Sequence, residues 1–101
     1  MKTSEFIDVI AAKLHQLLDH HREPADTPEL IHELTGIAQH IGDVYYPASK
    51  HAEALVAAAR SYYGPESWKL DSETCSALDR TMRNAVVKLA TESTRCRMNN
   101  D

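Results

Sequence analysis

Four stretches of this chain place apolar residues at intervals of three and four, and no stretch alternates apolar and polar residues as a β-strand does. The few glycines and prolines cluster between these stretches. The pattern predicts an all-α fold with helices at about 4–20, 27–44, 47–63 and 71–95, followed by a frayed tail at 96–101. For 101 residues with short connections, we expect a single domain: a compact bundle of four amphipathic helices, antiparallel or partly orthogonal.

Alanine dominates the third predicted helix, which carries Ala48, Ala52, Ala54, Ala57, Ala58 and Ala59. Small side chains allow a neighbouring helix to approach closely. The same face could pack on a second copy of the chain, so the sequence also allows a homodimer.

The sequence contains no candidate for a membrane span. Its longest uncharged apolar stretch, 54–59, is far shorter than the roughly 20 residues that a bilayer requires. Glu5 and Asp8 interrupt the apolar residues near the N-terminus, which does not resemble a secretory signal. We expect a cytoplasmic protein that does not bind membranes.

Cys75 and Cys96 fall 21 positions apart along the last predicted helix and its tail. In a continuous helix this spacing corresponds to roughly 30 Å, whereas a disulfide requires Cα atoms within about 7 Å. We therefore expect no bond between them, with Cys75 as a small residue of the bundle seam and Cys96 as a tail thiol.

Six histidines raise the question of a metal site. His15 and Asp19 are four residues apart and could share one side of a site with His32 or His51 from another helix. The chain has no Cys-x-x-Cys and no His-Glu-x-x-His motif, however, and a structural zinc site usually needs four ligands. We expect no metal and no cofactor.

A polar stripe runs along the second predicted helix within a sector of roughly 80°; it consists of Glu29, Glu33, Gly36, His40 and Asp43. With the segment IGDVY at 41–45 and His51-Ala52 downstream, it resembles the all-α nucleotide pyrophosphatases of the MazG type. That resemblance implies acids on neighbouring helices holding magnesium over a nucleotide. The simpler interpretation is the solvated face of an amphipathic helix. That interpretation does not explain Gly36, because an exposed glycine inside a helix costs about 1 kcal/mol relative to alanine, and we expect it to mark the close approach of a partner. We expect no catalytic residue.

The segment 34–55 resembles a helix-turn-helix. In that family Ala38 would pack between the helices and Gly42 would form the turn, while the groove-facing side chains would be Tyr45, Tyr46, Ser49 and Lys50. Between residues 37 and 63, however, only Lys50 and Arg60 oppose two acids, and the chain carries a net charge of −4. Because phosphate neutralisation supplies most non-specific affinity for DNA, we do not expect nucleic acid to be the partner.

Aromatic residues bracket the third predicted helix: Tyr45, Tyr46, Tyr62, Tyr63 and, in the loop that follows, Trp68. Adjacent residues on a helix point about 100° apart, so in each tyrosine pair we expect one ring buried and one displayed. Tyrosine and tryptophan are enriched at binding hot spots, and Arg60 lies beside them. The sequence thus favours a small helical protein that binds another protein, as an inhibitor, adaptor or regulator of the kind that phages and mobile elements often encode.

Overall fold

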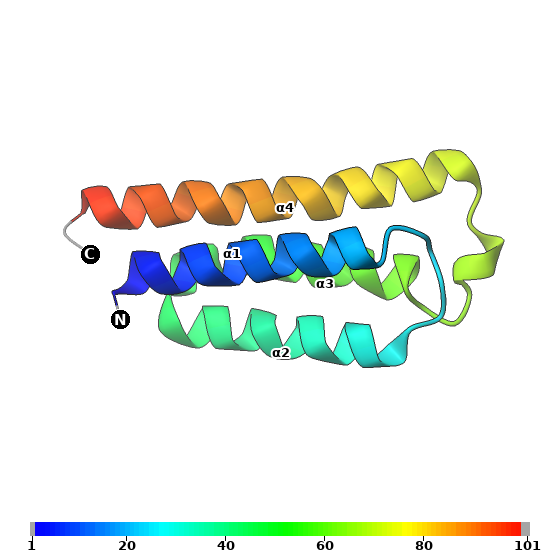
Figure 1. Cartoon of the computed structure of the whole chain (residues 1–101), viewed down its shortest axis with the longest axis horizontal. Helices are drawn as coiled ribbons and strands as arrows, with labels where there is room; N and C mark the ends of the chain where they lie inside the picture. The colour runs from blue at the N-terminus through cyan, green and yellow to red at the C-terminus, as the bar shows by residue number, and fades with distance from the viewer. Residues whose placement is uncertain (1, 100–101) are drawn as a thin grey trace.

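The computed structural model describes residues 2–99, which form an all-α bundle without strands in that range. Four α-helices and two short 3-10 helices follow one another: α1 Thr3–His20, α2 Pro28–Val44, η1 Tyr46–Ala48, α3 Ser49–Tyr62, η2 Ser67–Lys69 and α4 Ser72–Met98. The four α-helices run along the long axis of the molecule in alternating directions (Figure 1). Of the two arrangements expected, the bundle adopts the antiparallel one.

The 27 residues of α4 set the length of the molecule. At about 1.5 Å per residue they span roughly 40 Å, close to the longest dimension of 46 Å. Asp71 starts this helix by accepting the backbone N–H of Thr74 at 2.7 Å, as an N-cap does. α4 packs on both α1 and α3, whereas α2 packs mainly on α3.

The apolar stripes of all four helices meet in one core. Its most deeply buried members come from every helix and include Leu14, Leu34, Leu55, Met82 and Leu89. Ala52, Ala58 and Ala59 are also buried, which confirms that the alanine-rich helix has close neighbours. Packing of this kind accounts for most of the stability of such helices, because isolated helices of this length are marginal in water.

The C-terminal region differs from the expected frayed tail. Helix α4 continues to Met98, and Cys96 is buried, at 8% exposure, so it is not a tail thiol. The reason is the first two turns of α1, which lie beside this segment: the hydroxyl of Ser93 donates to the carbonyl of Ser4 at 3.0 Å, and Arg97 Nη2 contacts Asp8 Oδ2 at 2.6 Å. The last two positions of the expected tail, 100 and 101, lie outside the described residues.

Pro47 does not open α3 directly. Tyr46, Pro47 and Ala48 form the 3-10 helix η1, and α3 begins at Ser49. Within the described chain, no helix is both long enough and apolar enough to cross a membrane.

Candidate functional site

The two loops at the end of the bundle opposite the start of α1 and the end of α4 form the candidate site (Figure 1). We call this region the loop end; it comprises residues 21–27, between α1 and α2, and residues 63–71, between α3 and α4. Trp68 stands on η2 in the second loop with 77% of its surface exposed. Trp68 is the single tryptophan of the sequence.

Backbone hydrogen bonds hold the turn that carries Trp68. The N–H of Ser67 donates to the carbonyl of Gly64 at 3.1 Å, and the N–H of Leu70 donates to the carbonyl of Ser67 at 3.1 Å. At Gly64, a Cβ atom would lie 2.2 Å from the carbonyl oxygen of Arg60, so only glycine allows the chain to leave α3 at this point. The turn is therefore fixed in place before any partner arrives.

Tyr62 and Tyr63 tie the two loops together. The hydroxyl of Tyr63 donates to the carbonyl of His21 at 2.6 Å, and the hydroxyl of Tyr62 donates to the carbonyl of Arg22. In the other direction, the N–H of Thr27 donates to the carbonyl of Tyr63 at 3.0 Å. Burial raises the pKa of both phenols above their ordinary value, most strongly for Tyr63.

The expectation that one ring of this pair is displayed is wrong, because both residues are buried, at 4% and 1% exposure. The 100° rule does not apply to them: Tyr62 ends α3, and Tyr63 is the C-cap, with φ −113° and ψ 19°. The two rings instead meet edge to face, with centroids 4.9 Å apart. These buried tyrosines hold the two loops of the loop end together and contribute little to its exposed surface.

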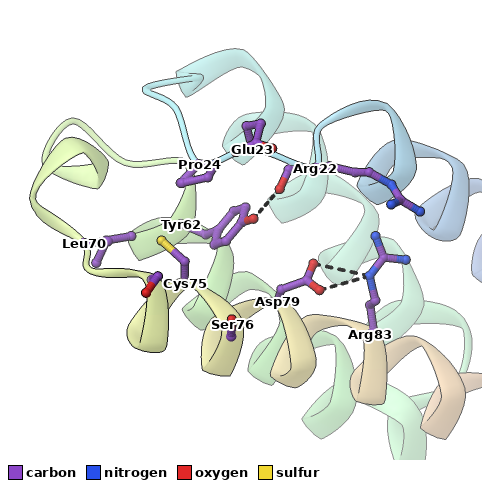
Figure 2. Close-up of a pocket in the computed structure, with 10 residues that line it drawn as sticks. Arg22, Glu23, Pro24, Tyr62, Leu70, Cys75, Ser76, Asp79 and Arg83 are labelled. Carbon is purple, nitrogen blue, oxygen red and sulfur yellow. Dashed lines mark hydrogen bonds and ion pairs between the residues drawn. The ribbon is translucent and has the colours of Figure 1, made fainter.

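A hollow of about 840 Å³ opens beside the loop end (Figure 2). It lies between the α1–α2 loop and the first turns of α4, and its lining includes Arg22, Pro24, Tyr62, Leu70, Cys75 and Asp79. Leu70 also lines a second hollow of about 410 Å³, which includes Arg60 and Lys69. The turn that carries Trp68 thus leads directly into Leu70, the residue that lines both hollows.

The arginines of the larger hollow are paired. Arg83 contacts Asp79 through Nε at 3.3 Å and Asp19 through Nη1 at 3.0 Å, while Arg22 lies 3.7 Å from Asp19. The hydrogen bond from Arg83 lowers the pKa of the Asp19 carboxyl, which is therefore charged at neutral pH. Because these cations are already paired with acids, the hollow does not offer an unpaired arginine to an anion.

Tyr45 and Tyr46 lie at the opposite end of α3 from Trp68 (Figure 1). Here the expectation for the pair holds, because Tyr46 is 78% exposed and Tyr45 packs against the core. The 14 residues of α3 separate the two ends by roughly 21 Å. The structure therefore divides the expected aromatic patch into two separate places, and of its aromatic residues at the loop end only Trp68 is exposed.

All five residues of the polar stripe on α2 are exposed. Glu33 Oε1 lies 3.6 Å from Lys13 Nζ of α1, and the ring of His40 contacts that of Phe6 with centroids 4.9 Å apart. A Cβ atom on Gly36 would meet nothing within 4 Å, so the chain itself makes no close approach there. Among residues 2–99, no group of three or more His, Cys, Asp or Glu side chains could hold a metal ion.

The geometry that the helix-turn-helix resemblance implies is absent from the described chain. Gly42 lies inside α2 and does not form the turn. Helices α2 and α3 run antiparallel along the bundle (Figure 1) and do not cross at the roughly 90–120° of that motif. Ala38, Tyr46 and Ser49 line a hollow between α2 and α3, and Lys50 is exposed on α3.

One buried acid was missed by the sequence reasoning. Glu92 is 3% exposed, with Oε1 at 3.5 Å from His51 Nε2 and at 3.0 Å from Arg95 Nη1. Its Oε2 has no hydrogen-bond partner among the described residues. The signal was available, because Glu92 follows Leu89 by three residues and so continues the apolar series of α4.

No protein-family model matches this chain, and no curated protein or solved structure is significantly similar to it.

Proposed function

We propose that this protein acts by binding another protein, as an inhibitor, adaptor or regulator, and that the loop end is its contact surface. The observation that carries the proposal is the exposure of Trp68, 77%, on a turn whose backbone is held by its own hydrogen bonds. The partner is a protein with an apolar pocket that accepts the indole ring.

Burial of the indole would provide much of the affinity. An aromatic side chain buries about 150–250 Å². At about 25 cal/mol per Å², covering the exposed 77% of Trp68 contributes roughly 3–5 kcal/mol before the costs of association. Because the turn is already ordered, little backbone entropy is lost on binding, and this is the usual advantage of a preorganised contact.

Charged groups beside the indole would set the orientation of the partner. Lys69 Nζ lies 5.3 Å from the centroid of the Trp68 ring and 3.5 Å from Glu66 Oε1. Lys69 and Glu66 are well exposed, so they would form the polar rim of a contact centred on the indole.

The test is capture from a lysate of the source organism with the tagged full chain, followed by titration of the purified partner. Because Trp68 is the only tryptophan of this chain, a partner without tryptophan allows its fluorescence to report binding directly. We expect a blue shift on binding and at least about a tenfold loss of affinity for Trp68→Ala.

Tyr46→Ala is the matched control, since Tyr46 is equally exposed at the other end of α3. A partner that binds wild type and Trp68→Ala equally well, with no change in indole emission, would overturn the proposal.

A further inference from the structure

The groove between α2 and α3 provides a second surface, whose lining does not include Trp68. It is a hollow of about 420 Å³ whose walls include the small or apolar residues Ala38, Gly42, Val56 and Ala57. Glu53 and Arg60 line the same hollow on α3, on either side of Val56 and Ala57.

The two charged residues that α3 contributes to this groove have no ion-pair partners within the described chain, and Asp43 of α2 also lines it. Neither Glu53 nor Arg60 makes an ion pair among residues 2–99. Both are exposed, and seven positions separate them, so they project from one side of α3 about two turns apart. One side of the helix therefore presents an acid, the exposed Ala57 and a base in that order, while Val56 between them is buried at 7% exposure.

This order is complementary to itself when reversed. In a two-fold dimer every contact occurs twice: if one residue of the first copy meets a second residue of the other copy, the same two residues also meet with the copies exchanged. An antiparallel pairing of α3 with its own copy whose two-fold axis passes between positions 56 and 57 brings the exposed Ala57 of each copy near the centre of the contact and sets Glu53 against Arg60, twice. A register shifted toward Glu53 would instead bring two glutamates together.

We propose that the α2–α3 groove is the interface of a homodimer, in which α3 packs antiparallel on α3 of a second copy and Glu53 of each chain pairs with Arg60 of the other. The contact does not include Trp68, but Arg60 also lines the second hollow beside Lys69, so the dimer interface adjoins the loop end.

The experiment measures the dimer dissociation constant of the full chain by sedimentation equilibrium. We expect wild type to dimerise and each of the variants Glu53→Arg and Arg60→Glu to raise the dissociation constant at least about tenfold, because like charges then face each other at both ends of the contact. Arg80→Glu, a reversal on an exposed position of α4 outside the groove, is the control and should have no effect.

A mixture of the two single variants distinguishes pairing from misfolding. One chain then carries two bases and the other two acids, so both contacts are complementary and a heterodimer should form. A wild type that stays monomeric at all concentrations would overturn the proposal. So would single variants that dimerise like wild type, or folded single variants that do not associate with each other.

Discussion

Removing the hydroxyl of Tyr63 isolates the bond that fastens the α1–α2 loop to α3. Tyr63→Phe keeps the ring, which is buried at 1% exposure, and deletes only the donor to the carbonyl of His21, 2.6 Å away. A hydrogen bond of this kind contributes about 0.5–1.5 kcal/mol net, and an abandoned buried acceptor adds to the loss. We expect a loss of about 1–2 kcal/mol in the free energy of unfolding, or roughly 5–15 °C in Tm for a chain of this size.

The assay is urea unfolding followed by far-UV circular dichroism, with thermal unfolding as a second measure. The midpoint should fall while the m value stays constant, because the change does not alter the surface exposed on unfolding. Tyr46→Phe removes the same atom from a ring that is 78% exposed and should change stability by less than about 0.5 kcal/mol. Equal midpoints for the two variants would refute the assignment of Tyr63 as a structural tie.

Three further outcomes are expected. Burial raises the pKa of Tyr62 and Tyr63 above the ordinary value of 10.0. Their contribution to the free energy of unfolding is therefore fully present below pH 10.0 and is lost as the pH rises above it. In urea titrations at alkaline pH, Tyr63→Phe should lose less stability than wild type does. The backbone N–H of Thr74 lowers the pKa of Asp71 below its ordinary value of 3.8. The stabilising effect of this cap is therefore fully present above pH 3.8 and is lost as the pH falls through the pKa that Asp71 has in the folded protein. The difference in Tm between wild type and Asp71→Ala should shrink in acid and persist at neutral pH. Glu92→Met replaces a buried acid that has an unpartnered oxygen and should leave Tm equal or higher, whereas a large fall would show that its pair with His51 stabilises the bundle.

Helical periodicity predicted the bundle because it is a local property of the chain. The stripes that contain Leu14, Leu34 and Leu89 are legible in the sequence and form the core. The end of α4 was not predicted, since Cys96 and Arg97 stand among polar residues and their cover comes from α1, at the far end of the sequence.

The candidate site was predicted only in part, because its residues lie where helices end. The exposure of Trp68 depends on a turn, and the burial of Tyr63 depends on a loop more than forty positions earlier in the chain. Helical periodicity cannot predict the exposure of either residue, because neither lies inside an α-helix. The self-complementary order of Glu53, Val56, Ala57 and Arg60 was legible in the sequence, but only the structure shows that these residues share one hollow.

The pairing of α1 with α4 also has a consequence for biosynthesis. Ser93 Oγ lies 3.0 Å from the carbonyl of Ser4, a contact that spans 89 positions. Translation therefore delivers the first helix long before the helix that covers most of it, and much of the apolar stripe of α1 stays uncovered until the last turns of α4 leave the ribosome. Loop closure over this distance slows folding relative to a bundle whose neighbours are consecutive. A nascent chain stalled before α4 should remain sensitive to protease until those final residues are released.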